Sequence, residues 1–292
     1  MITIDESRCN LCGICVPICP RKILHLGERS VEVTDPLMCL ACGHCKAICP
    51  TDAPRLTGSE PFAAVPTKEE IPSPDPFLRF LRRRRSLRKY QKRPVEKEKW
   101  DWIIDAGRYS PTGGNRQICE FTVVNGRKML DPVCTLAMGY LQAEGQRVQD
   151  ILDRYRHSKE PLPADMVGKE VYPPVWDRMA RAWEKGGDQL LHQAPGLIVV
   201  HMKRGVISTP EVEGGIAATH MVLMAETLGL GTCFIGFLIW AIESAEKLKK
   251  LLQVPADHQS LVAFTVGYPD VEYLRLPARR PAKVTWLGET SS

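Results

Sequence analysis

The sequence predicts an α+β protein with two domains of different character. Eight of its eleven cysteines lie in two runs within the first fifty residues. Prolines then cluster in residues 59–76, and beyond them segments of helical period alternate with well-separated strand segments. A chain of 292 residues has room for one small and one large domain. We expect a cysteine-rich domain over 1–58, a linker over 59–76 and a helix–sheet domain with a small mixed sheet over 77–292.

The small domain is defined by a cysteine spacing that occurs twice. The two runs are Cys9-x2-Cys12-x2-Cys15-x3-Cys19-Pro20 and Cys39-x2-Cys42-x2-Cys45-x3-Cys49-Pro50. A disulfide framework is typical of short secreted chains, and we expect no signal peptide at this N-terminus. Structural zinc explains pairs of CxxC but not two runs that each end in x3-Cys-Pro. The spacing favours iron–sulfur clusters, whose chemistry is electron transfer.

These runs resemble the bacterial ferredoxins with two [4Fe–4S] clusters, over residues 1–57. The resemblance implies that the fourth cysteine of each run ligates the other cluster. One cluster is then held by Cys9, Cys12, Cys15 and Cys49, and the other by Cys19, Cys39, Cys42 and Cys45. The small residues Gly13, Ala41 and Gly43 would let backbone amides approach the sulfurs, which raises the reduction potential.

Charge and hydropathy exclude some classes of function. A net charge of +5 is only mildly basic and does not argue for nucleic acid, although residues 82–93 form one dense basic block. No apolar run reaches the length of a membrane span. The remaining cysteines, Cys119, Cys134 and Cys233, are expected to be buried small apolar residues. Thiolate-ligated clusters and unpaired thiols predict a reducing, cytoplasmic location.

The elements of the large domain follow from periodicity. Helical spacing begins at 77–81, and further helices are expected over 100–106, 127–157 with a break, 213–228 and 242–252. Strands are expected over 121–124, 197–202, 233–240 and 261–268. Residues 158–175 are rich in proline and glycine and predict a loop.

Two segments of this domain resemble the nitroreductase family of flavin mononucleotide (FMN) enzymes. Residues 84–90, Arg-Arg-Ser-Leu-Arg-Lys-Tyr, are similar to the family's opening R-R-S-x-R-x-F/Y. Guanidinium and hydroxyl groups suit a flavin phosphate, although an arginine run also fits a solvated face. Residues 106–117 resemble its A-x-x-A-P-S-G-x-N-x-Q turn, with departures at 109–111 and 113–114. A plain turn has the same composition.

Two later segments extend the resemblance to about residues 77–290. Residues 213–236 are similar to D-x-G-A-A-x-Q-N…L-G-L-G-(T/S)-x-x-x-G, and their glycines precede a strand, which argues against a dinucleotide fingerprint. Gly-Tyr-Pro at 267–269 and a basic pair before Pro281 resemble the family's ending. The resemblance implies a three-layer fold that binds FMN at the interface of a homodimer. It assigns to FMN the residues Arg84, Arg85, Ser86, Arg88, Asn115, Gln117, Glu213, Gly214, Gly231, Thr232, Arg279 and Arg280.

Together the two resemblances predict an oxidoreductase that passes electrons from an external donor through two [4Fe–4S] clusters to FMN. The donor would be reduced ferredoxin or a similar carrier, with NAD(P)H as the other source, and the acceptor a nitroaromatic, a quinone or a similar small planar molecule. The alternatives are a specialised flavin reaction, such as reductive dehalogenation or dehydrogenation, and a relay without small-molecule turnover.

The sequence does not single out a side chain as the catalytic acid, so we assign no catalytic residue. Residues 158–175 and the segment after them are candidates for a substrate lid. Tyr172, Trp176 and Trp183 would either stack on the acceptor or pack a helix.

Overall fold

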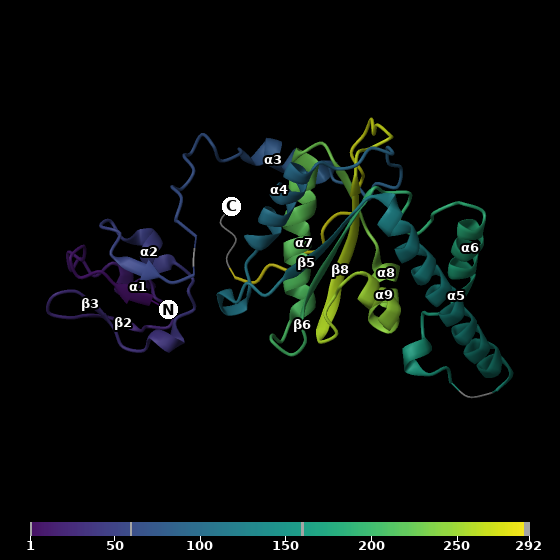
Figure 1. The fold of residues 1–292 in the computed structure, drawn as a ribbon, viewed down its shortest axis with the longest axis horizontal. Coiled ribbons are helices and arrows are strands. Elements are labelled where there is room, and N and C mark those ends of the chain that lie inside the picture. The colour runs from purple at the N-terminus through teal and green to yellow at the C-terminus, as the bar shows by residue number, and fades with distance from the viewer. Residues whose placement is uncertain (1, 59, 159–160, 289–292) are drawn as a thin grey trace. The chain divides into compact units, whose positions relative to one another are not determined.

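The computed structural model describes residues 2–58, 60–158 and 161–288 (Figure 1). The chain divides into two compact units. One holds Met1–Ile71 together with Ser110–Ile118, and the other holds Pro72–Tyr109 together with Cys119–Ser292. The turn 110–118, which the motif placed in the large domain, therefore groups with the cysteine-rich region.

The first unit is built on two short antiparallel ladders. Its strands are β1 (Ile2–Ile4) paired with β4 (Pro54–Leu56), and β2 (Leu24–Leu26) paired with β3 (Val31–Val33). Its helices are α1 (Cys15–Ile18), α2 (His44–Ile48) and the 3-10 turns η1 (Pro36–Met38) and η2 (Gly113–Asn115). Its buried core is small and consists of Ile2, Cys15, Ile23, Leu24, Val31 and Cys45. Two thiols of the cysteine runs are thus part of the core itself.

The second unit contains a four-stranded sheet of order β5-β6-β8-β7, in which every pair is antiparallel. The strands are β5 (Glu120–Asn125), β6 (Gly196–Lys203), β7 (Gly231–Phe234) and β8 (His258–Gly267). A single parallel bridge between Ser86 and Thr232 adds the basic segment beside β7. β6 is buried along nearly its whole length, as expected for a strand covered on both faces.

Helices cover both faces of this sheet and give three layers (Figure 1). Ile198 and Val200 pack against α4 (Lys97–Arg108) and α7 (Pro210–Thr227). The alternate residues Leu197 and Val199 join the core formed with the helices of the opposite face. Those helices are α5 (Arg127–His157), α6 (Tyr172–Glu184), α8 (Gly236–Ser244) and α9 (Glu246–Leu251). The alternation of side chains along β6 therefore builds two cores.

Some expected element boundaries are wrong. The strand expected over 233–240 ends at Phe234, and α8 begins at Gly236. The residues after Gly236 are apolar on all sides, and such a short run fits a buried strand or a buried helix equally well. The break expected within 127–157 is absent, because α5 continues through Pro132. Helix α3 (Pro74–Arg83) begins inside the expected linker, with Pro74 at its first position.

Tyr172, at the end of the 158–175 stretch, and Trp176 just after it pack a helix. Trp176 is fully buried and stacks on Tyr172 with ring centroids 5.3 Å apart. Both rings meet Phe237 and Trp240 of α8 edge to face. This arrangement favours the packing role over stacking on an acceptor. Within the described residues, no helix combines the length and apolarity needed to cross a membrane.

Candidate functional site

The eight cysteines of the two runs line two separate cavities in the first unit. One cavity is lined by Cys9, Cys12, Cys15 and Cys49. The other is lined by Cys19, Cys39, Cys42 and Cys45. Each run thus contributes its first three cysteines to one cavity and its fourth to the other. Four thiols around one space are the donor set that a [4Fe–4S] cluster requires.

The backbone of the two runs repeats as their sequence does. Leu11 and Ala41 occupy equivalent positions and have positive φ angles of 59° and 50°. Gly13 and Gly43 follow with φ of 71° and 77°, a region that favours glycine. These turns wrap the first three cysteines of each run around their cavity, so the spacing acts through backbone geometry.

Backbone amides approach the sulfurs, as the small residues predict. Ala41 N donates to Cys39 Sγ at 3.4 Å, and Ala53 N donates to Cys49 Sγ at 3.4 Å. Burial opposes ionisation of Cys49, but the donors from Ala53 and Thr51 outweigh it and lower the pKa of this thiol. Such hydrogen bonds stabilise negative charge on sulfur, which is what a cluster ligand carries.

Burial acts in the opposite direction at Cys45. Removal from water raises the pKa of this thiol to about 11, and the neighbouring Cys42 and Cys39 contribute further. The pKa of Cys15 in the other cavity is also raised by burial. As ligands, these thiols would need the compensating positive charge of a metal cluster, and cluster binding would then be coupled to folding of this unit.

In the second unit, the basic segment is fixed beside β7. Leu87 N donates to Thr232 O at 2.8 Å, next to the bridge between Ser86 and Thr232. Gly231 makes this approach possible, because a Cβ at its position would lie 2.4 Å from Leu87 Cδ2. The fold thus joins Ser86 and Thr232 of the expected FMN set, although they are distant in sequence.

Arg84, two residues before Ser86, has a buried donor atom. Among the described residues, no hydrogen-bond partner is found for its buried Nη1 atom or for the buried hydroxyl of Thr232. Burial raises the pKa of the Cys233 thiol, while Arg88, Ser86 and Arg84 act to lower it. Ser86 and Arg88 therefore lie in polar contact with this thiol, and the charge of Arg84 acts on it. A buried guanidinium donor without a partner fits an anionic group such as a phosphate.

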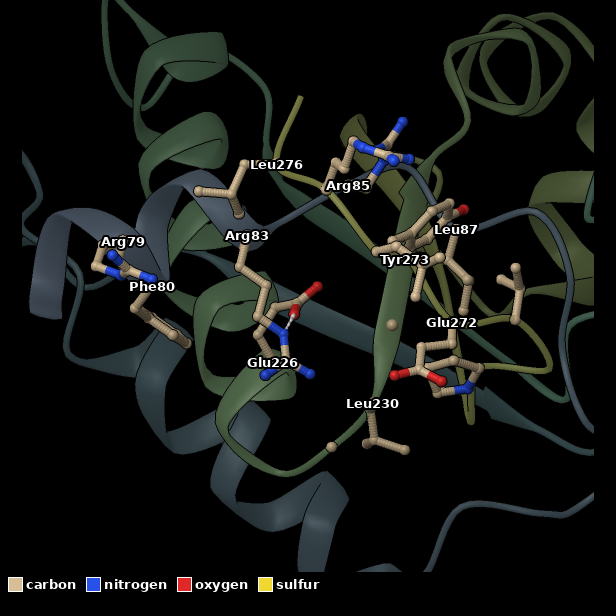
Figure 2. A pocket seen from close by; sticks show the side chains of 16 residues that line it. Arg79, Phe80, Arg83, Arg85, Leu87, Glu226, Leu230, Glu272, Tyr273 and Leu276 are labelled. Carbon is tan, nitrogen blue, oxygen red and sulfur yellow. Dashed lines mark ion pairs between the residues drawn. The ribbon is translucent and has the colours of Figure 1, made fainter. Parts of the chain in front are cut away.

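A cavity of about 680 Å³ lies next to this segment (Figure 2). Arg83 points toward Glu226 there, with Nε 3.8 Å from Oε2. Burial raises the pKa of Glu226, against the neighbouring Arg83 and Arg84. The Arg85 guanidinium lies 4.3 Å from the centre of the Tyr273 ring, which holds the C-terminal tail over the cavity.

Glu213 and Gly214 of α7, both expected to contact FMN, are buried within the second unit. Gly214 faces β8, because a Cβ there would lie 2.7 Å from Leu261. Glu213 is buried. The pKa of the Cys119 thiol is raised to about 11, first by burial of this thiol and then by the neighbouring Glu213. The glycine at position 214 is therefore required for packing between helix and sheet.

Asn115 and Gln117 lie in the turn that groups with the first unit. Asn115 Nδ2 donates to Leu40 O at 3.2 Å and to Ala41 O at 3.0 Å, inside the second cysteine run. Gln117 N donates to Thr112 Oγ1 at 2.9 Å. The turn is thus tied to the loop that lines one of the four-cysteine cavities.

Two family models match the chain in the same two regions. Residues 81–268 match the model of the nitroreductase family. The chain belongs to the nitroreductase family. Residues 5–53 match the 4Fe-4S dicluster domain. Both resemblances drawn from the motifs are therefore confirmed, together with the α+β fold class.

Individual relatives of the nitroreductase domain agree with this assignment. A candidate NADH dehydrogenase/NAD(P)H nitroreductase of Methanothermobacter thermautotrophicus is 24% identical over 66% of this chain and 76% of its own. The FMN-bound nitroreductase of Bacteroides fragilis shares the fold with a TM-score of 0.54 at 20% identity, over 72% of this chain and 98% of its own. The FMN-bound nitroreductase of Desulfitobacterium hafniense gives 0.54 at 21% identity, over 74% and 100%.

The basic pair near the C-terminus, Arg279 and Arg280, lies in a segment without helix or strand. Arg279 and Arg280 are exposed, and Arg279 donates to the carbonyl of its neighbour Ala278. The structure does not bring this pair to a regular element, so their expected role stays a prediction.

The sequence did not predict the positions of two residues of the nitroreductase domain near the basic segment. Cys233 is buried as expected, but its thiol lies with Ser86 and Arg88 in a polar contact. Burial lowers the pKa of His192, with Arg88 adding to the effect and Asp188 opposing it. No local motif marks either residue, because both reach the arginines through the tertiary fold.

Proposed function

We propose that this nitroreductase-family protein is an oxidoreductase that passes electrons from an external donor through two [4Fe–4S] clusters to FMN, which reduces a nitroaromatic, a quinone or a similar small planar acceptor. The observation that carries the proposal is the pair of four-cysteine cavities in a chain whose larger part is a nitroreductase domain. Clusters deliver single electrons, and FMN, when bound, accepts one or two. The match to a 4Fe-4S dicluster domain supports the clusters.

FMN is supported by the FMN-bound relatives and by the chemistry of the basic segment. Arg84, Ser86 and Arg88 would hold the phosphate, because a buried guanidinium donor and a hydroxyl converge there. Thr232 offers a second buried hydroxyl next to them. The rest of the set given by the resemblance stays part of the proposal.

We propose a homodimer with FMN at the subunit interface, as the resemblance implies. The C-terminal tail exposes large apolar side chains, among them Leu274, Trp286 and Leu287. A partner subunit would cover such residues, which are unfavourable in water. We place the protein in the cytoplasm, where thiols stay reduced.

We propose reduced ferredoxin or a similar carrier as the main donor. The name of the Methanothermobacter relative makes NAD(P)H the other candidate. Anaerobic turnover of a nitroaromatic and of a quinone tests the choice, with each donor supplied alone. We expect turnover with reduced ferredoxin that is lost when Cys12 and Cys42 are both replaced by alanine.

The control for this assay is Cys119→Ala, which removes a thiol outside both cavities and should keep full activity. If NADPH drove the same rate of turnover in the double variant as in the cluster-loaded wild type, the proposed electron path would be contradicted. No turnover of any small acceptor by the loaded protein would favour a relay instead of an enzyme.

A further inference from the structure

Two buried histidines face each other at one end of the sheet in the second unit. His201 in β6 and His258 at the start of β8 are 3% and 6% exposed. Their Nδ1 atoms lie 3.0 Å apart. Two imidazole nitrogens this close must share a proton or a cation, because two lone pairs or two N–H groups would repel each other.

The strand register brings a carboxylate to the same place. Glu120 of β5 is the direct cross-strand partner of His201. A register shift between Val200 and His201 marks a bulge in the pairing with β8, and such bulges re-aim side chains. Three adjacent strands thus contribute one ligand-type side chain each to a single position.

The three groups have the spacing of a metal site. One potential ligand atom of each of the three residues lies within 4.8 Å of those of the other two. Two nitrogens bound to a tetrahedral zinc ion are roughly 3.3 Å apart, given Zn–N bonds of about 2.0–2.1 Å. The observed 3.0 Å between the Nδ1 atoms needs only a small opening to reach this value.

A neighbouring hydroxyl can hold His201 in the orientation that such a site needs. Thr122 Oγ1 lies 3.2 Å from Nε2 of His201. With the proton on Nε2 donated to Thr122, the Nδ1 lone pair of His201 is left for a cation. Metal-bound histidines commonly donate their other ring nitrogen to a polar neighbour in this way.

The surroundings allow an ion to enter and offset part of the positive charge near the site. Glu120, Thr122 and His201 line a cavity of about 570 Å³, and the Glu120 side chain is 60% exposed. One cation nearby, Lys249, donates to the carbonyls of Ala256 and His258 and lies 3.8 Å from Glu243. Its charge is therefore partly balanced.

We propose that Glu120, His201 and His258 bind one divalent transition-metal ion of the zinc class. A set of two imidazoles and one carboxylate suits zinc and leaves a fourth position open to water or to a ligand in the cavity. The ion would join β5, β6 and β8. This site uses none of the eight clustered cysteines and none of the basic segment, so it stands apart from the proposed function.

Zinc binding to the cluster-loaded full-length protein tests the proposal. Equilibrium dialysis against Zn²⁺, followed by metal analysis, should give one zinc per chain in the wild type. Binding should be lost in His201→Gln and in His258→Gln, and weakened in Glu120→Gln. Thr122→Val should weaken it about tenfold through the orientation of His201. The matched control is His157→Gln, an exposed histidine at the end of α5.

X-ray absorption at the zinc edge identifies the ligands directly. We expect nitrogen and oxygen neighbours that include two imidazoles. A sulfur shell would overturn the proposal, as would absence of zinc from the wild type or equal binding by all three ligand variants. If the buried histidine variants fail to fold, Glu120→Gln carries the test, because its exposed side chain can change without loss of the core. Unchanged zinc affinity in that variant would also overturn the proposal.

Discussion

The two units of this protein hold their sites in opposite ways. In the cysteine-rich unit, the site residues are close in sequence and form part of a small core. In the nitroreductase domain, two extensive cores fix the sheet first, and the sheet then joins Ser86 to Thr232 across the sequence. We therefore expect the fold of the first unit to depend on the proposed clusters, whereas the second unit supplies a fold on which its proposed site depends.

Removal of the clusters should produce the largest difference between the units. Cys12→Ala and Cys42→Ala together take one ligand from each cavity. We expect residues 1–71 to unfold and become sensitive to protease, while the nitroreductase domain keeps its helical circular dichroism and its melting temperature. Equal protease resistance of 1–71 in the cluster-free variant and in the wild type would show that the small core is sufficient.

The next largest effect is expected at the basic segment. Arg84→Ala and Arg88→Ala should each weaken FMN binding about 10- to 100-fold, because a hydrogen bond to a charged group contributes about 1.5–3 kcal/mol. Fluorescence titration with FMN measures this, and the iron–sulfur absorbance should not change. Arg82→Ala, in the exposed part of the same block, is the matched control. An equal loss in the control would mean that general positive charge, not this contact, attracts FMN.

Two adjacent glycines of α7 differ in how closely they pack against the rest of the fold. Gly214→Ala should lower the free energy of unfolding by about 1–3 kcal/mol, because the new Cβ meets Leu261 at 2.7 Å. Gly215→Ala meets nothing within 4 Å and should raise it by about 0.5–1 kcal/mol. Chemical denaturation of the apoprotein reports both. If the two variants are equally stable, the close contact with β8 is not what requires glycine.

The smallest effect concerns acid stability. Tyr268 donates to Glu96, and with the backbone and Arg93 it lowers the pKa of Glu96 from 4.5 to about 2. The stabilisation is therefore present above pH 4.5 and is lost as the pH falls toward 2. Glu96→Gln should be less stable than the wild type at pH 7, with the difference shrinking below pH 4.5. A difference that is the same at pH 3 and pH 7 would contradict this coupling.

The sequence predicted the first unit well because its information is local. Cysteine spacing and the small residues at positions 13, 41 and 43 define the turns, and Ala41 does donate to a sulfur. In the second unit the motifs predicted FMN roles for Arg84 and Thr232, which stay predictions. They gave no signal for the polar surroundings of Cys233, since those arise from strand pairing. The helix after Phe234 was predicted as a strand, because a continuous apolar run shows neither a helical nor a strand period.

The histidine pair shows the limit of local reasoning most clearly. His201 lies within an apolar strand, and His258 follows a turn, so neither has a motif. Their meeting depends on the order of β6 and β8 and on one bulge. Such a site is found from the fold alone.

We propose that electrons reach the flavin through the clusters. Anaerobic stopped-flow mixing of the loaded protein with reduced ferredoxin tests it, with cluster and flavin absorbance followed together. We predict that the clusters are reduced first, that the flavin follows, and that flavin reduction by ferredoxin is lost in Cys12→Ala/Cys42→Ala. Reduction of the flavin before the clusters, or at an undiminished rate in the variant, would contradict this electron path.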